Sequence, residues 1–473
     1  MRYPMSSEGR EYLEQLEQLG PAGQWALERI IFLTLENLRL KQELETARAS
    51  IKQLDERLEQ LHQQAHRQAA PFRRAEEQRN AHPARAGRKA GHPGSFRPRP
   101  AQIDEHLHVP LDGCPLCGGP VCDKVPLIQY IEEIPVVRPR VTELVTEEGW
   151  CAGCQQQVYS THPLQSGRAT GAAAVQLGPR ALALACDLNK AKGLSMRRTV
   201  GILEEHFGLK ITAGGLAQLV QRVGRKVQPS YEQMAVELRQ SAVVHADETS
   251  WWVGGPGWWL WVFATAKMTF YVVIRSRAAS VAMGVLGENF AGVLVSDCLA
   301  IYDDLNPLQH KCYSHHLKAV SEALEMVAGG AEDYLRQVQA LLRTAILLKA
   351  LQGPTPDQRF VLCVNTLKER AHSLLDSPRA AVVEEKVRLR LWKQRDHLFT
   401  FLDHAQVPAT NNLAERQLRP AVIARKISCG NKTEKGALAW AVLASVAATC
   451  RQRGHSFIET IRLSVLLHPA LGP

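Results

Sequence analysis

Long apolar runs are missing from this sequence of 473 residues. No stretch approaches the roughly 18 residues that mark a membrane-spanning helix. The N-terminus, MRYPMSSEGREYLEQLEQ, is polar and acidic where a signal peptide would be apolar. We therefore expect neither a membrane protein nor a secreted protein, and the predicted location is the cytoplasm. Eleven cysteines in so long a chain fit a reducing compartment, where closely spaced pairs bind metal more often than they form disulfides.

The sequence also lacks the biased composition of fibrous or disordered chains. Hydrophobic residues make up 45% of it and charged residues 22%, which is ordinary for a folded protein and excludes a wholly disordered or collagen-like chain. A chain of this length is too long for one hydrophobic core, so roughly two to four domains are expected.

The net charge of +10 is concentrated in two stretches. Residues 67–100 carry nine basic and two acidic side chains, and residues 411–453 carry eight and two, whereas residues 1–66 are net negative. Two separate basic stretches indicate a polyanionic partner such as nucleic acid. Solvated surface charge is the alternative.

Residues 30–61 have apolar side chains spaced alternately by three and four, which predicts a coiled coil. A lone Asn at an a position pairs best with its own copy, so Asn37 favours a parallel dimer. An internal helical hairpin is the alternative. The predicted d positions are Leu33, Leu40, Ala47, Leu54 and Leu61, and the predicted a positions are Asn37, Leu44, Ile51 and Leu58.

Two modules are predicted between residues 67 and 165. Residues 67–105, which include GRKAGHPG and FRPRP, show no apolar period and are typical of a linker or a DNA-contacting arm. Two CxxC pairs then flank a β-rich stretch, and four thiolates from such turns complete a closed, structural zinc site. The predicted zinc ligands of this ribbon are Cys114, Cys117, Cys151 and Cys154.

Residues 166–240 have a helical pattern that contains a helix-turn-helix. Gly208 supplies the turn and Thr212 an N-cap for the second helix. That helix is basic only near its end, so a plain helical packing unit and a DNA-reading unit are both open.

Residues 241–304 change to strand character. SAVVHADETSWW, WWLWVFATA and MTFYVVIRSR are rich in β-branched and aromatic residues, with a turn at Gly254-Gly-Pro-Gly257 between the first two. Three consecutive antiparallel strands are predicted, followed by a helix and the strand GVLVS in a mixed α/β sheet. The five tryptophans of this region are more typical of sheet core than of a base-stacking platform.

Two predicted strands end in a carboxylate, Asp247 after AVVHA and Asp297 after GVLVS. Carboxylates at neighbouring ends of buried strands imply a cation between them, and magnesium is the expected one. A third ligand would come from NNLAERQLRP, where Asn411 or Asn412 caps a helix that carries Glu415 in its first turn. The acids that remain alternatives are Glu248, Asp303, Asp304, Glu384 and Glu385.

Basic side chains flank these acids in the sequence. Arg416 and Arg419 follow Glu415 on one predicted helix, where their guanidinium groups are placed to meet phosphates. The predicted DNA contacts are Arg88 and Lys89 in the arm, and Arg416, Arg419, Arg425 and Lys426 in the C-terminal stretch.

Four motifs, HADET, VSDCLAIYD, CYSHHLK and NNLAERQLRPAVIARK, occur in this order behind the cysteine pairs. Together they resemble the insertion sequence sixty-six family of bacterial transposases over nearly the whole chain. The resemblance implies an RNase H-like catalytic core whose Asp-Asp-Glu triad corresponds to Asp247, Asp297 and Glu415. The family usually has Cys-Trp-Ala-His where this sequence has Cys312-Tyr-Ser-His315, so the roles of Cys312 and His315 are left open. We also expect no long tail after the last helix.

The resulting prediction is a multidomain α/β protein with an RNase H-like mixed-sheet core and an α-helical insertion. The expected order is a helical, coiled-coil segment at 1–66, a basic arm at 67–105, a zinc ribbon at 106–165, a helix-turn-helix-like DNA-binding domain at 166–240, the catalytic core at 241–318 and 405–455, the insertion at 319–404 and a tail at 456–473.

The resemblance further implies a DNA transposase that uses two magnesium ions, with manganese as a substitute, to cleave and join the ends of a bacterial insertion sequence at the nucleoid. The expected partners are double-stranded DNA, further copies of the chain bound through the coiled coil, and small accessory proteins of the same element, with no membrane partner. The alternatives are a non-catalytic DNA-binding regulator built from the same modules and a structure-selective nuclease that cuts without joining.

Overall fold

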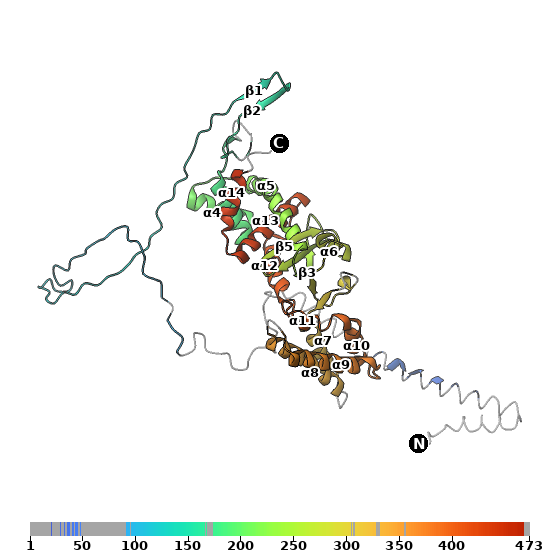
Figure 1. Ribbon diagram of the computed structural model, residues 1–473. Coiled ribbons are helices and arrows are strands. Elements are labelled where there is room, and N and C mark those ends of the chain that lie inside the picture. The colour runs from blue at the N-terminus through green and yellow to red at the C-terminus, as the bar shows by residue number, and fades with distance from the viewer. Residues whose placement is uncertain are drawn as a thin grey trace. The chain divides into compact units, whose positions relative to one another are not determined.

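The computed structural model describes residues 91–94, 96–165, 167, 174–303, 305, 308–327, 332–353 and 356–467, together with Gly20 and ten single residues between Arg29 and Arg48 (Figure 1). The chain divides into two compact units, Met1–Glu132 and Glu133–Pro473. Among the described residues, no helix combines the length and the apolar character needed to cross a membrane.

In the first unit, the described part of the predicted coiled coil is helical. Leu33, Leu40 and Leu44 are 41%, 56% and 51% exposed, and Nδ2 of Asn37 donates a hydrogen bond to the carbonyl of Leu33 at 3.2 Å. The other predicted a and d positions, together with Arg88 and Lys89, lie outside the described residues. Dimerisation through this helix therefore stays a prediction.

The second unit begins with a two-stranded hairpin and a group of helices. Strands β1 (Glu148–Cys151) and β2 (Gln156–Tyr159) are antiparallel, with Cys151 opposite Gln156. The helices that follow are α3 (Pro179–Cys186), the π-helix η3 (Asp187–Ala191), α4 (Met196–Phe207) and α5 (Ala213–Arg239).

Helices α4 and α5 form the predicted helix-turn-helix. Gly208 ends α4 in the left-handed conformation with a φ of 64°, which glycine adopts at little cost. Thr212 caps α5 by accepting a hydrogen bond from the N–H of Gly215 at 3.0 Å. Leu216, Val227 and other side chains of α5 are buried in the largest hydrophobic cluster of the unit. Such burial is what the packing-unit alternative requires, and DNA reading by α5 stays a prediction.

A mixed five-stranded sheet forms the centre of the second unit, in the order β5-β4-β3-β6-β7. The three consecutive antiparallel strands predicted from the sequence are confirmed, whereas β6 and β7 run parallel to β3. The strands are β3 (Val243–Trp251), β4 (Trp258–Thr265), β5 (Met268–Ile274), β6 (Val293–Ser296) and β7 (Gln309–Lys311); between them lie α6 (Ala279–Leu286) and the 3-10 helix η4 (Ala300–Tyr302).

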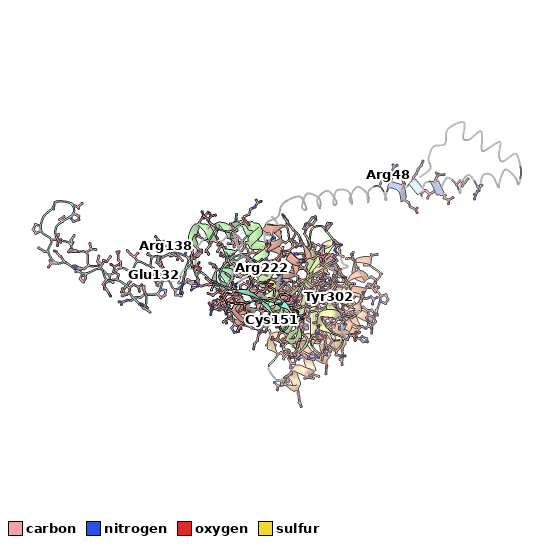
Figure 2. The ribbon with its side chains drawn as sticks, turned by 90° about the horizontal axis from the view of Figure 1, so that it is seen from above. Arg48, Glu132, Arg138, Cys151, Arg222 and Tyr302 are labelled. Atoms are coloured by element: carbon pink, nitrogen blue, oxygen red, sulfur yellow. The ribbon has the colours of Figure 1, made fainter. Side chains whose placement is uncertain are left out.

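Helices cover both faces of this sheet. Alternation along β3 and β4 directs Ala246 and Phe263 to one face, where α5 packs, and Val262 to the other, where α12 and α13 pack. Trp251, Trp258 and Trp261 are buried, as expected for sheet core. Figure 1 shows α5, α13 and β5 together, and Figure 2 labels Tyr302 within the packed part of the unit.

The described chain between β7 and α12 is mostly helical, and its apolar side chains form a cluster around Leu335, Leu342 and Phe401 that also includes Val293 and Val295 of β6. The elements of this region are α7 (Tyr313–Met326), α8 (Asp333–Leu351), α9 (Gln358–Asp376), α10 (Val382–Lys393), η5 (Arg395–His397) and α11 (Thr400–Asp403). The last helices are α12 (Asn412–Ser428), α13 (Glu434–Arg453) and α14 (Phe457–Leu467).

Candidate active site

Asp247 lies inside β3, which corrects the expectation that it ends a strand. Strand β3 continues to Trp251 because the long hairpin partner β4 pairs with it as far as Trp258. The parallel partner β6 is short and pairs only with Val243–His245. Asp247 therefore lies just past the point where pairing with β6 stops, and Asp297 is the first residue after β6. The two carboxylates lie where these neighbouring strands separate.

Glu415 reaches the same region from α12. Alternation along β3 places Asp247 on the face with Trp251, and that face is covered by Ala414, Leu418 and other side chains of α12. Glu415 stands in the first turn of this helix, next to the buried Ala414. The packing of α12 therefore directs Glu415 towards the sheet face that carries Asp247.

The charges of Asp297 and Glu415 both act on Asp247, but among the described residues the three acids do not each bring an oxygen within 4.8 Å of the other two. The pKa of Asp247 is raised to about 7, mainly by burial and also by the negative charges of Glu248, Asp297 and Glu415, whereas the N–H of Glu248 lowers it. Oδ1 of Asp247 accepts this N–H at 2.8 Å, and Oδ1 of Asp297 accepts the N–H of Leu299 at 3.0 Å. Each hydrogen bond fixes a carboxylate and leaves its second oxygen for another ligand.

The alternative acids are neutralised by their neighbours. Glu248 points to the opposite sheet face, where Arg277 contacts Oε1 at 2.9 Å and the Tyr302 hydroxyl donates to Oε2. Asp303 forms ion pairs with Lys393 at 2.8 Å and with buried Lys311 at 3.4 Å.

The remaining alternatives lie elsewhere in the chain. Glu385 pairs with Arg388 on α10 at 2.7 Å, and Glu384 is its neighbour in the first turn of the same helix. Asp304 lies outside the described residues. By contrast, no ion pair within the described part of the chain involves Asp247, Asp297 or Glu415.

Asn411 joins the three segments that carry these groups. It occupies the N-cap position of α12, but its side chain makes no capping hydrogen bond, contrary to the sequence expectation. Nδ2 instead donates to the carbonyl of Ala246 at 2.8 Å, and Oδ1 lies 3.1 Å from Nδ1 of His245. Its backbone N–H donates to Sγ of Cys312 at 3.2 Å. Buried Asn411 thus fixes the start of α12 against β3 and against the start of α7.

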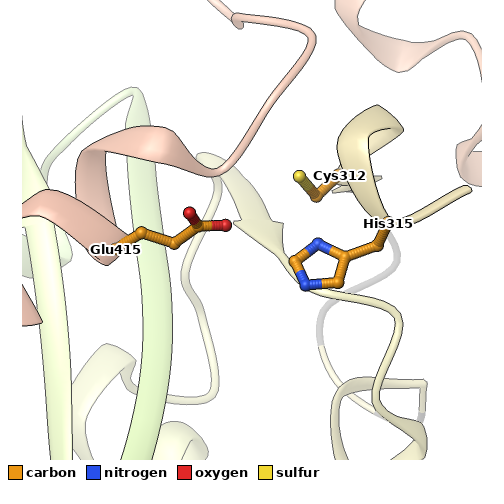
Figure 3. A group of neighbouring side chains, drawn as sticks. All are labelled: Cys312, His315 and Glu415. Atoms are coloured by element: carbon orange, nitrogen blue, oxygen red, sulfur yellow. The ribbon is translucent and has the colours of Figure 1, made fainter. Parts of the chain in front are cut away.

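Cys312 and His315 stand beside Glu415 (Figure 3). One ligand atom from each of these three residues lies within 4.8 Å of the other two, and they are the only such three among the described residues. Burial by itself raises the pKa of Cys312, but its contact with His315 and the N–H of Asn411 outweigh burial and lower the pKa. The same contact raises the pKa of His315, as do the charges of Asp297 and Glu415. The sequence left both roles open, and the structure places them at the edge of the acidic site.

A cavity of about 390 Å³ opens next to Glu415. Its lining includes His245 and Asn412, and Arg416 and Arg419 contribute the positive charge. Arg425 is used differently, because its guanidinium donates to Ser250 and to Oγ1 of Thr249 on β3. Lys426 is exposed further along α12. The arginines nearest Glu415 are therefore those placed to meet a phosphate group.

Each cysteine pair of the predicted ribbon forms a turn. In the first unit, the N–H of Gly118 donates to the carbonyl of Cys114 at 2.8 Å, and backbone N–H groups of Leu116 and Cys117 lower the pKa of Cys114. In the second unit, the N–H of Cys154 lowers the pKa of Cys151. Turns that direct N–H groups at sulfur favour the thiolate, which is the form that binds metal. Zinc binding by the four cysteines stays a prediction.

Comparisons with known proteins agree with the motif resemblance. The family model described as "Transposase IS66 family" matches residues 174–439. The chain is also similar to an uncharacterized protein, y4qI, of Sinorhizobium fredii, with 24% identity over 363 residues that cover 68% of this chain. The chain spans 65% of the length of that relative.

Proposed function

Because this chain belongs to the transposase IS66 family, which is the insertion sequence sixty-six family of the motif resemblance, we propose that it cleaves the ends of a bacterial insertion sequence and joins them to target DNA. The observation that carries the proposal is that the charges of Asp297 and Glu415 act on half-buried Asp247, with no ion pair among the described residues to offset the three acids. Like charges grouped in this way need a cation.

We infer that the cation is magnesium, bound as two ions by Asp247, Asp297 and Glu415, with manganese as a substitute. The donor set fits, because hard divalent cations prefer carboxylate oxygens. In such sites, paired metal ions activate the attacking oxygen and stabilise the leaving one. The protein side chains hold the carboxylates in place: the N–H groups of Glu248 and Leu299 orient Asp247 and Asp297, and Asn411 orients the helix that carries Glu415.

We propose that the five-stranded sheet is the RNase H-like core implied by the resemblance. Supporting this proposal, β3 is the first strand of a three-stranded antiparallel meander, the parallel strands β6 and β7 lie on its other side, and Asp247 and Asp297 lie where β3 and β6 separate. The helices between β7 and α12 then form the insertion before the last catalytic residue. Resolving the same sheet in crystals grown with magnesium and a DNA end would test the assignment, and a different strand order would refute it.

Arg416 and Arg419 are the DNA contacts that the geometry favours most. Replacing both with Gln should weaken DNA binding for all sequences alike and reduce the salt dependence of log K by about one unit per lost phosphate contact. Binding isotherms at several salt concentrations would measure this slope. Arg462→Gln is the matched control, because that guanidinium is already paired with Glu459 at 2.8 Å. Equal slopes for wild type and the double variant would exclude these phosphate contacts.

The direct test of the function uses full-length protein, magnesium and DNA carrying candidate element ends. A transposase should yield new 3′-hydroxyl ends and also joined molecules. Cut DNA without joined molecules would favour the structure-selective nuclease, and bound but uncut DNA would favour the non-catalytic regulator. Adding the small proteins encoded beside the element tests whether accessory partners are required.

We propose that two further modules support this activity. The cysteine pairs at 114–117 and 151–154 would form a structural zinc ribbon, and Cys114→Ser should then lower the zinc content by one ion per chain.

The N-terminal helix would join two copies of the chain, so that one assembly holds two DNA ends. A chain without residues 1–66 should have the mass of a monomer in light scattering, and an unchanged mass would refute dimerisation through this helix.

A further inference from the structure

The cluster of Cys312, His315 and Glu415 offers three different donor atoms at one point. Sulfur, imidazole nitrogen and carboxylate oxygen all lie within 4.8 Å of one another, and Figure 3 shows Glu415 reaching from α12 towards the two residues at the start of α7. Packing alone does not explain Glu415 and His315, since both remain partly exposed, whereas Cys312 is buried.

Backbone hydrogen bonds hold the two halves of the cluster together. The N–H of Asn411, which precedes α12, donates to Sγ of Cys312 at 3.2 Å. The N–H of Tyr313, at the start of α7, donates to the carbonyl of Ala409 at 3.0 Å. The two segments that carry the donor atoms are therefore held together by backbone hydrogen bonds.

One donor atom of the cluster is buried without a partner. Nδ1 of His315 finds no hydrogen-bond partner of regular geometry among the described residues, although it is shielded from solvent, and in Figure 3 this ring nitrogen faces Cys312 and Glu415. A buried polar atom left in this way requires an explanation. A metal ion in the space between the three side chains would provide one.

The chemistry of the donors selects the metal. Thiolate and imidazole suit zinc, whereas magnesium prefers oxygen ligands alone. One thiolate and one carboxylate also neutralise a divalent ion, and three protein ligands leave a fourth position for water or a DNA oxygen.

We propose that Cys312, His315 and Glu415 bind a zinc ion, and that this ion competes with magnesium for Glu415. Binding forms three metal–ligand bonds and releases the thiol proton of Cys312 to solvent, with no oxidation or reduction. The competition rests on the proposed role of Glu415 in catalysis, whereas zinc binding itself does not. Zinc would then act as a reversible inhibitor of DNA cleavage.

The first experiment measures binding without reference to activity. Full-length wild type and Cys312→Ser are dialysed against the same zinc buffer, and the zinc bound per chain is determined by elemental analysis. Wild type should retain one zinc ion more than Cys312→Ser. The matched control is Cys298→Ser, which removes a neighbouring thiol that lies 3.5 Å from Nε2 of His316 and should leave the zinc content unchanged.

A second variant guards against misfolding of the buried Cys312 site. His315→Asn changes a partly exposed residue and should lose the same zinc ion. Cobalt added after the tighter zinc sites are filled should give a thiolate charge-transfer band in wild type and none in either variant. Equal zinc content and equal cobalt spectra in wild type and both variants would overturn the proposal.

The second experiment tests the competition. Cleavage at fixed magnesium is measured against increasing free zinc, and each protein is compared with its own zinc-free rate. Cys312→Ser should raise the zinc concentration for half-inhibition by on the order of 10-fold or more, since changes around a metal site cost 10- to 100-fold in affinity. Additional magnesium should relieve inhibition of wild type. Zinc binding without inhibition would refute the competition, and normal cleavage by Glu415→Gln would refute only the triad.

Discussion

Asp247→Asn, Asp297→Asn and Glu415→Gln are each expected to abolish DNA cleavage, with a loss of about three orders of magnitude or more, as when a group of a cooperating catalytic set is removed. Each amide keeps the size of the side chain but cannot supply the charge that holds a divalent cation. DNA binding should remain, because removing a negative charge weakens no phosphate contact. Single-turnover cleavage and binding isotherms on the same preparations would measure both.

Glu434→Gln is the matched control for this series. Glu434 stands in the first turn of α13 as Glu415 does in α12, but it is exposed. The cleavage rate of Glu434→Gln should stay within about twofold of that of wild type, as expected for an exposed surface carboxylate. A triad variant that cleaves as fast as this control would remove that residue from the assignment.

The same Asp247→Asn change should stabilise the metal-free protein. The pKa of Asp247 is raised to about 7, so the stability that its protonated form contributes is fully present below the unfolded value of 3.8 and is lost as the pH rises through about 7. At pH 8 wild type therefore carries an ionised, poorly solvated carboxylate. Removing its charge should add a few kcal/mol to the free energy of unfolding, at about 1.4 kcal/mol per pKa unit.

Urea unfolding with and without magnesium would measure this effect. Magnesium should stabilise wild type at pH 8 and stabilise Asp247→Asn much less, because the ligand that magnesium neutralises is gone. The gain from the substitution should also be smaller at pH 5, where the folded wild type is already protonated. A variant that is less stable than wild type at pH 8 without metal would show that Asp247 is not under this electrostatic strain.

The sequence was sufficient to predict the sheet but not where the predicted acids lie on it. The β-branched and aromatic stretches around GGPG predict the meander correctly, because strand propensity and turn chemistry are local. The position of Asp247 within β3 depends instead on how far β4 and β6 extend alongside it. The lengths of β4 and β6 are set by tertiary pairing. The sequence alone therefore could not show that β3 continues with β4 as its partner after its pairing with β6 has ended.

Side chains that act across the fold were the least predictable. Asn411 looks like a helix cap because Asn is favoured there, yet it bonds to β3, far away in the sequence. Arg425 looks like a phosphate contact but donates to Ser250 and Thr249. Cys312 and His315 carried one usable signal, since a spacing of three at the start of a helix puts both side chains on one face. Only the folded chain shows that this face meets Glu415.

The N–H of Tyr313 donates to the carbonyl of Ala409, and the N–H of Asn411 donates to Sγ of Cys312. These two hydrogen bonds join the start and the end of the chain segment that contains α7 to α11. A segment whose ends are closed in this way can grow, shrink or be exchanged as a module without moving the residues on either side. Evolution is therefore free to vary the intervening helices while Glu415 keeps its position. Among related chains, differences in length should accumulate between residues 313 and 409 and be rare at the two ends of this segment.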